Sequence, residues 1–221
     1  MCAQYWIDKA DLEDVIKEIE EKQAENEQLS FLKTGLIRPT DTAPVYAVGR
    51  AGIVPVPMKF GFPPLQAKGA PRINARADTA FSLEMWKTPL LKRRVAAPTS
   101  GFFEWKHREG KSTGERYLFT RSDRKTLYLC GMYSVFTTDE GKKEVRFTVL
   151  TTEPNDSIAE YHNRMPLLLD PEERDRWLLD EEYIKEVIYR PQPALTATYN
   201  PAETAKKKGA VQVSLFGASY R

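Results

Sequence analysis

The chain has 221 residues, of which 41% are hydrophobic and 29% charged, a composition typical of one globular domain. Its formal net charge of only +2 excludes a globally cationic surface, so a nucleic-acid site would have to be a local basic patch. Two cysteines, Cys2 and Cys130, do not make a disulfide framework and favour a reducing cytoplasm. The N-terminus lacks the apolar segment of a signal peptide, and no apolar run approaches the roughly 20 residues that cross a bilayer.

The first half of the sequence predicts one helix followed by short strands. Apolar residues recur at the i, i+3, i+4 and i+7 positions from Leu12 to Ile19, which indicates an amphipathic helix. Strands are expected around Val45–Val48 and Ile53–Phe60, in a segment rich in Val, Pro and Gly. The segment Phe81–Leu91 is expected to be helical.

The second half predicts strands with short helices between them. Tyr117–Thr120 and Thr126–Tyr133 flank a polar turn and are expected to form a hairpin. Val145–Thr152 alternates apolar and polar residues and predicts a further strand. Asn155–Tyr161 suits a short helix capped by Asn155, and Asp170–Glu173 has the acid, proline and glutamate of a helix start, with the helix running to about Leu179.

This pattern lacks strict strand–helix–strand alternation. We therefore expect an α+β fold in which a strongly bent, barrel-like β core carries peripheral short helices. The whole chain, residues 1–221, is expected to form one domain, with residues from about 200 onward as a loosely attached tail. The apolar run Leu127–Met132 predicts that Cys130 is a buried core thiol.

Cys2 directly follows the initiator methionine, which is usually removed before a small residue. Removal would leave an α-amine and a thiol on one residue. An aldehyde can condense with the amine to a Schiff base, and the thiolate can then close a five-membered thiazolidine ring. The ordinary pKa values, about 8 for the amine and about 8.5 for the thiol, leave both nucleophiles partly available near neutral pH. The plainer interpretation is a frayed terminus without function.

Glu104 and His162 are candidates for proton transfer. Glu104 lies between Phe103 and Trp105, and a carboxylate among aromatic rings should have a raised pKa because burial disfavours its charged form. The alternative is a surface glutamate that alternates outward while its neighbours face inward. His162 follows a predicted helix and is expected in a turn, either as a catalyst or as a hydrogen-bonded structural residue.

Several polar and basic residues suit a nucleic-acid contact. Asn74, Arg76 and Asp78 alternate, so an extended backbone would place them on one face, where they would orient a carbonyl and hold a phosphate. A polar turn closed by an Arg–Asp pair fits equally well. Lys59 beside Phe60 pairs a cation with an aromatic ring, a combination that suits single-stranded nucleic acid, although most such runs are solvated surfaces.

The sequence gives no support for a metal or another cofactor. It contains no P-loop, no G-x-G-x-x-G, no H-E-x-x-H and no C-x-x-C motif. With only two histidines, His107 and His162, a catalytic metal site is not expected.

Five segments, taken in order, match the pattern of a known family. The family begins Met-Cys and carries the blocks N-A-R-x-E-T, P-A-S-G-F-Y-E-W, F-T-I-L-T-T and H-x-R-M-P. The corresponding segments here are Met1–Cys2, Asn74–Thr79, Pro98–Trp105, Phe147–Thr152 and His162–Pro166. The chain thus resembles the SRAP family, the SOS response-associated peptidase domain, over most of its length.

The resemblance implies a DNA damage protein that shields abasic sites in single-stranded DNA through a covalent thiazolidine link to the mature N-terminal Cys2. It implies that Glu104 is the general acid/base that helps open the deoxyribose to its aldehyde. His162 would assist Schiff-base formation or reversal of the link, and Asn74 would orient the N-terminal residue.

The same resemblance assigns a DNA-binding surface. Arg76 and Arg164 would grip the flanking phosphates, and Phe60, with Lys59 beside it, would stack on or wedge against a base. The partner would be single-stranded DNA with abasic sites, bound by a monomer that contacts no membrane.

Three departures from the family pattern touch this surface. Ala3 and Gln4 stand where the family has Gly-Arg, which removes one expected cation. The segment Lys59–Phe62 replaces the family's R-W-G-L, so a phenylalanine replaces the tryptophan, and Asp78 replaces a glutamate. None of these changes removes an implied catalytic residue.

Two other functions remain open at this stage. In the first, Cys2 is the nucleophile of a thiol peptidase, with His162 as base, that removes its own Met1 or a short leader. A lyase activity is not part of this alternative; it would accompany the abasic-site chemistry that the family resemblance implies. In the second, the chain binds single-stranded DNA without a covalent step, and Cys2 is incidental.

Overall fold

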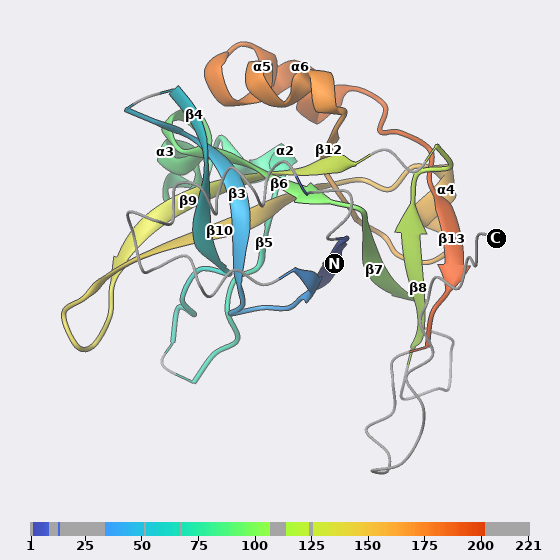
Figure 1. Cartoon of the computed structure of the whole chain (residues 1–221), viewed down its shortest axis with the longest axis horizontal. Helices are drawn as coiled ribbons and strands as arrows, with labels where there is room; N and C mark the ends of the chain where they lie inside the picture. The colour runs from blue at the N-terminus through green and yellow to red at the C-terminus, as the bar shows by residue number, and fades with distance from the viewer. Residues whose placement is uncertain are drawn as a thin grey trace.

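The computed structural model describes residues 2–8, 13, 34–50, 52–66, 68–106, 114–123 and 126–201. The helix expected from Leu12 onward, His107 and the tail expected beyond about residue 200 lie almost entirely outside these ranges. Two β-sheets dominate the described part, and short helices lie at its periphery (Figure 1).

Five strands of the larger sheet close into a barrel in the order β4–β3–β6–β9–β10, because β10 pairs with both β9 and β4. The bounds are Thr42–Gly49 for β3, Gly52–Phe60 for β4, Arg94–Thr99 for β6, Leu127–Thr137 for β9 and Lys143–Thr152 for β10. Three short strands extend this sheet: β5 (Asn74–Arg76), β11 (Met165–Pro166) and β12 (Leu168–Leu169). The expected barrel-like core and the strands at 45–48, 53–60 and 145–152 are confirmed.

Small residues let the barrel strands approach closely. All six residues of β6 are buried, and Ala96 and Ala97 occupy its centre. A side chain at Gly131 would place its Cβ 2.6 Å from the Thr148 carbonyl oxygen and 2.8 Å from a methyl of Val95. Cys130 is fully buried, as predicted.

The smaller sheet has the strand order β13–β8–β7–β1–β2. Its strands are β1 (Gln4–Ile7), β2 (Gly35–Ile37), β7 (Gly101–Lys106), β8 (Glu115–Thr120) and β13 (Thr196–Tyr199). Ser100 is the one residue between β6 of the barrel and β7 of this sheet, and its backbone N–H donates to Trp6 O at 2.8 Å. This contact fixes β1, and therefore the residues before it, against the strand that carries Glu104.

The helices are short. They are α2 (Ala77–Ala80), α3 (Glu84–Lys92), α4 (Asp156–Ala159), the 3-10 turn η3 (Pro171–Glu173), α5 (Arg174–Leu179) and α6 (Tyr183–Tyr189). The Asn155 side chain caps α4 by accepting from Ser157 N, and Asp170 and Glu173 form the expected capping box. Figure 1 shows α5 and α6 together at one end of the barrel. No described helix has the length and apolarity to span a bilayer.

The hairpin expected between Tyr117–Thr120 and Thr126–Tyr133 is wrong. β8 lies between β7 and β13 in the smaller sheet, whereas β9 lies in the barrel. Both hydrogen-bonding edges of β8 are therefore occupied by other strands. The segment between them instead carries the chain from one sheet to the other, and Arg121 within it forms ion pairs with Asp123 and Asp170.

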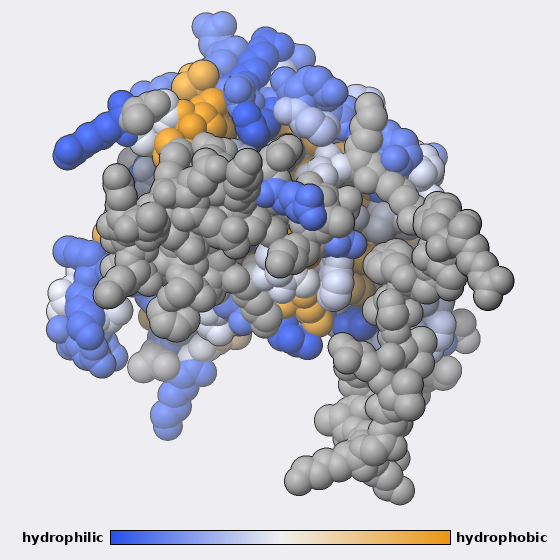
Figure 2. All heavy atoms as spheres, in the orientation of Figure 1, coloured by the Kyte–Doolittle hydropathy of each residue, from blue (hydrophilic) through white to orange (hydrophobic). Residues whose placement is uncertain are grey.

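On the face shown in Figure 2, the coloured residues are mostly hydrophilic, with a few hydrophobic patches between them. An apolar groove runs along the β3–β4 hairpin and includes Val48, which is partly exposed.

Candidate active site

Cys2 lies two residues before the first residue of β1 and is fully buried in the chain that carries Met1. β1 pairs antiparallel with β7, with Gln4 opposite Phe103, so the preceding residues run alongside Glu104. The Asn74 side-chain amide donates to the Cys2 carbonyl oxygen at 3.1 Å. Three segments that are distant in sequence, β5, β7 and the chain start, therefore meet at Cys2.

Glu104 is buried with 1% of its surface exposed, so the alternative of an outward-facing surface glutamate is wrong. It lies on β7, between β1 and β8. Burial raises the pKa of the Glu104 carboxyl from 4.5 to about 7, because a low-dielectric surrounding disfavours the carboxylate. A carboxyl group with this pKa both gives and accepts a proton near neutral pH.

Burial, followed by the nearby Glu104 carboxylate, raises the pKa of the Cys2 thiol. The Cys2 thiol is therefore protonated in the folded chain. Its Sγ lies 3.8 Å from the Gln4 carbonyl oxygen, which accepts a weak hydrogen bond. A nucleophilic thiolate at this position needs a proton acceptor close by, and Glu104 is such a group.

His162 follows α4 in a turn, as predicted, and its Nε2 lies 4.0 Å from Glu104 Oε2. The backbone N–H of Arg164 donates to His162 Nδ1 at 3.0 Å. The same Nδ1 lies 3.1 Å from the Arg164 carbonyl oxygen, so the Arg164 backbone holds the ring in place with Nε2 facing Glu104 in either tautomer. The two groups predicted for proton transfer are thus neighbours.

Arg76 and Arg164 meet at Asp78. Arg76 donates to Asp78 Oδ2 at 2.8 Å, and Arg164 Nη2 lies 3.5 Å from Asp78 Oδ1. Arg164 is largely buried and also donates to Thr151 O at 2.6 Å, whereas the Arg76 side chain is 57% exposed. The Arg76 hydrogen bond lowers the pKa of the Asp78 carboxyl, which keeps it ionised. The alternating sequence predicts Asn74, Arg76 and Asp78 on one face of an extended segment. Only Asn74 and Arg76 lie in a strand, because Asp78 belongs to α2.

Phe60 cannot stack on a base from where it lies. Its ring is fully buried, stacked on Phe147 with a centroid separation of 5.1 Å and edge-on to Tyr5 at 5.6 Å. The prediction for Phe60 is therefore corrected: it is a core residue of the barrel wall. Lys59 is partly exposed and forms an ion pair with Glu144 at 2.8 Å.

Sequence reasoning missed an aromatic cluster that supports the histidine. Tyr161, directly before His162, packs edge-on against Tyr117 at 4.7 Å and Phe119 at 5.2 Å. The ammonium of Lys106 lies 5.0 Å from the centroid of the Tyr161 ring. The adjacency of Tyr161 to His162 was the one available signal, but its partners lie on strands far away in sequence.

Among the described residues, no group of three or more His, Cys, Asp or Glu side chains is arranged to hold a metal ion. The site consists instead of a thiol, a buried carboxyl group and an imidazole beside two guanidinium groups. These features define a small α+β protein whose chain start is built into an acid–base site.

The chain belongs to the SOS response associated peptidase (SRAP) family, whose model matches residues 1–206. It is 30% identical over 139 residues to abasic site processing protein YoqW of Bacillus subtilis, which covers 59% of this chain and 62% of that protein. It is 28% identical over 125 residues to abasic site processing protein YedK of Escherichia coli, which covers 57% of this chain and 55% of that protein. The matched region thus spans less than two thirds of these relatives.

Solved structures share the fold. A crystal structure of a Bacteroides thetaiotaomicron protein superimposes with a TM-score of 0.70 at 21% identity, covering 90% of this chain and 91% of the other. A Bordetella bronchiseptica protein superimposes with a TM-score of 0.69 at 19% identity, covering 91% of this chain and 100% of the other. At these identities the likeness extends to the fold alone.

Proposed function

We propose that this chain processes abasic sites in single-stranded DNA, and that it does so by forming a covalent thiazolidine link through Cys2 once Met1 has been removed. The observation that carries this proposal is the buried Glu104, with a pKa of about 7, beside the Cys2 backbone and His162. The names of the relatives, abasic site processing proteins in bacteria and yeast, support the substrate.

The chemistry needs an acid and a base at one point. Glu104 removes the proton of the sugar's anomeric hydroxyl and protonates the ring oxygen, which opens the sugar to its aldehyde. The Cys2 amine adds to the aldehyde carbon, and the hydroxyl leaves as water after protonation by Glu104 or His162. The Cys2 sulfur then adds to the imine carbon while the imine nitrogen takes up the thiol proton. One water is lost in total.

Asn74, Arg76 and Arg164 hold the reactants. The Asn74 amide fixes the Cys2 carbonyl, so the amine and thiol of Cys2 have a defined direction. In this proposal the guanidinium groups of Arg76 and Arg164 bind the phosphates on either side of the missing base. We assign this role to a monomer in a reducing cytoplasm, in line with the two free cysteines.

The thiazolidine reaction fits the site better than a thiol peptidase does. A cysteine peptidase needs a thiol whose pKa is lowered by a neighbouring imidazolium, whereas burial and Glu104 raise the pKa of the Cys2 thiol. A lyase activity follows if the Schiff base is released before the sulfur closes the ring. Removal of Met1 by the chain itself remains a secondary proposal suggested by the family's name.

The test is a denaturing gel of the purified chain mixed with single-stranded DNA that carries one abasic site. Intact-mass measurement first confirms which molecules have lost Met1. We expect a heat-stable adduct with the aldehyde-bearing DNA and none with the same DNA after borohydride reduction of the aldehyde to an alcohol. Adduct with the reduced DNA, or adduct from molecules that retain Met1, would contradict the thiazolidine chemistry.

A further inference from the structure

We propose that a cleft beside Arg164 binds the nucleotide next to the abasic site, with its base stacked on Tyr189 and the base's hydrogen-bonding edge facing Glu153. This inference rests on the proposed function. It adds a subsite with a base preference, carried by residues on the β10–α4 connection and at the end of α6.

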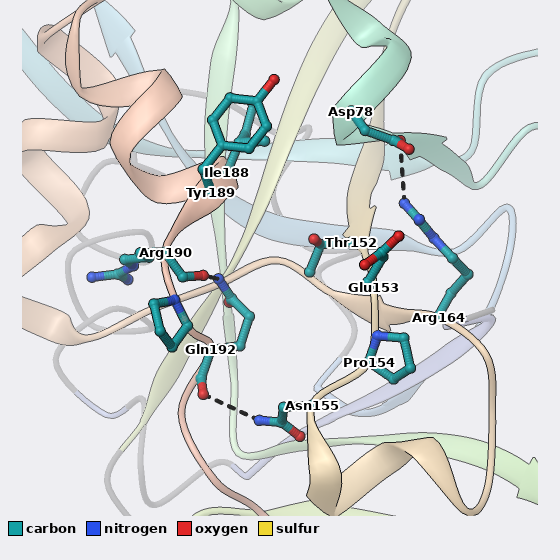
Figure 3. Close-up of a pocket in the computed structure, with 11 residues that line it drawn as sticks. Asp78, Thr152, Glu153, Pro154, Asn155, Arg164, Ile188, Tyr189, Arg190 and Gln192 are labelled. Atoms are coloured by element: carbon teal, nitrogen blue, oxygen red, sulfur yellow. Dashed lines mark hydrogen bonds and ion pairs between the residues drawn. The ribbon is translucent and has the colours of Figure 1, made fainter.

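The cleft has a volume of about 460 Å³ and opens between these two segments (Figure 3). This volume lies within the roughly 300–1,000 Å³ typical of small-ligand sites. Arg164 and its partner Asp78 form one wall, so the cleft begins where the proposed phosphate grip ends. A DNA strand whose phosphate is held by Arg164 would direct its adjoining base into this space.

Tyr189 forms the opposite wall and is 71% exposed. It is the last residue of α6, and Figure 3 shows its ring at the edge of the cleft. An exposed ring beside a phosphate-binding cation is the arrangement by which proteins hold single-stranded nucleic acid, because every base offers a face for stacking.

Most polar side chains of the cleft are already satisfied within the protein. The Asn155 amide donates to Gln192 O at 3.1 Å and Pro193 O at 2.9 Å. The Gln192 side chain accepts from Leu168 N at 2.9 Å, and Arg190 pairs with Glu173. These groups build the wall and are not available to a ligand.

The side chains of Glu153 and Thr152 differ from these paired wall residues. Among the residues that the structure describes, neither side chain makes a hydrogen bond, and Glu153 is exposed. In Figure 3 the Glu153 carboxylate lies on the side of Arg164, whereas the Thr152 side chain points away from the Asp78–Arg164 wall. Beside the paired Asp78, the cleft therefore presents the Thr152 hydroxyl and the Glu153 carboxylate, whose charge also acts on Arg76 and Arg164, to an incoming group.

A carboxylate repels a phosphate and accepts from an amino group, so the base rather than the backbone enters the cleft. Cytosine, adenine and guanine carry exocyclic amino groups that donate to a carboxylate, as in the pairing of Glu or Asp with cytosine N4. Thymine has no amino group, and two carbonyl oxygens flank its one ring N–H. The subsite should therefore prefer cytosine to thymine.

The test measures binding of single-stranded DNA with a tetrahydrofuran abasic analogue, which has no aldehyde and separates binding from chemistry. The neighbouring position on each side in turn holds cytosine, thymine or a base-free spacer. We expect the spacer on one side to weaken binding by about 5- to 100-fold. The Tyr189→Ala variant should bind all three DNAs as weakly as the wild type binds the spacer DNA, and Tyr189→Phe should behave as wild type.

Two further variants sharpen the assignment. Glu153→Gln should abolish the preference for cytosine over thymine while keeping the response to the spacer. Tyr199→Ala is the matched control, since Tyr199 is 58% exposed but lies on β13, and it should leave the response unchanged.

Equal binding of all DNAs by wild type and Tyr189→Ala would overturn the subsite. The same DNAs with a natural abasic site are assayed in parallel for adduct. Adduct formation that is indifferent to Tyr189 and to the neighbouring base leaves the proposed function standing and removes the subsite. Binding that depends on Tyr189 without any adduct has the opposite meaning: the subsite stands and the covalent chemistry fails.

Discussion

At the scale of single residues, the buried Glu104 should make the stability of this protein depend on pH. Its folded-state pKa of about 7 lies above the ordinary value of 4.5 because the carboxyl group is buried. Between these two pH values the folded chain holds a proton that the unfolded chain has lost. The free energy of unfolding therefore falls as pH rises through this window, by an amount on the order of 3 kcal/mol, and is flat outside it with respect to this group.

The Glu104→Gln variant should lack this dependence. In urea titrations at pH 5 and pH 8, we expect the variant to gain stability relative to the wild type as pH increases. Glu172→Gln, at an exposed position in η3, is the matched control and should track the wild type. Parallel stability curves for wild type and Glu104→Gln would show that the carboxyl titrates normally.

Asn74 should matter for chemistry more than for folding. Asn74→Asp replaces the amide donor at 3.1 Å from the Cys2 carbonyl with a carboxylate that repels it. We expect adduct formation to slow by about 10- to 100-fold, because the nucleophile loses its orientation. Rates are measured in single turnover with excess protein. A wild-type rate in Asn74→Asp would remove Asn74 from the site.

Residue-scale prediction succeeded where the cause is local. Phe103 and Trp105 flank Glu104 in sequence, so a raised pKa could be proposed from its neighbours, although their alternation equally allowed an outward-facing glutamate. The environment of Phe60 could not, because its ring partners Tyr5 and Phe147 come from other strands and reach it only in the closed barrel.

At the scale of elements, the proposed function predicts that the corner between β5 and α2 contributes to DNA affinity. Arg76 projects from this corner with its side chain 57% exposed, and Asp78 holds it in place. Arg76→Ala should reduce the slope of log affinity against log salt by about 0.7, the value of one phosphate contact on a single strand. Arg176→Ala on α5 serves as the control. An unchanged slope in Arg76→Ala would show that this arginine contacts no phosphate.

At Gly131, where β9 passes closest to β6 and β10, the barrel should not tolerate a side chain. In Gly131→Ala the new Cβ would lie 2.6 Å from the Thr148 carbonyl oxygen, which belongs to the backbone and cannot rotate away. We expect a loss of about 1–3 kcal/mol in the free energy of unfolding, measured by chemical denaturation. An unfolding midpoint equal to that of the wild type would show that the barrel wall relaxes at this point.

Sequence periodicity predicted single elements better than their pairing. The strands β3, β4 and β10 and the caps at Asn155 and Asp170 follow from local signals. The wrong hairpin shows the limit, because two strands joined by a polar turn can belong to different sheets. β8 cannot pair with β9 because its two edges are occupied by β7 and β13. Those two strands precede and follow β8 in the sequence, so the local hairpin pattern does not reveal them.

On the scale of the whole molecule, the closed barrel and the second sheet meet next to the chain start. The one-residue connection between β6 and β7 places Glu104 beside β1, while β10 carries β5 and β11 with Asn74 and the His162 segment. Because the net charge is only +2, the proposed DNA binding would have to depend on this local arrangement. The residue types of the site could be predicted from sequence blocks, but their meeting point depends on barrel closure.

The central claim is that Cys2, and no other residue, carries the covalent link. It is tested most directly by comparing adduct formation with abasic single-stranded DNA in wild type, Cys2→Ala and Cys130→Ala. Cys130 is the matched control because it is the other free cysteine and lies buried in β9. The account predicts heat-stable adduct with wild type and Cys130→Ala and none with Cys2→Ala. Adduct of equal yield with Cys2→Ala would contradict it.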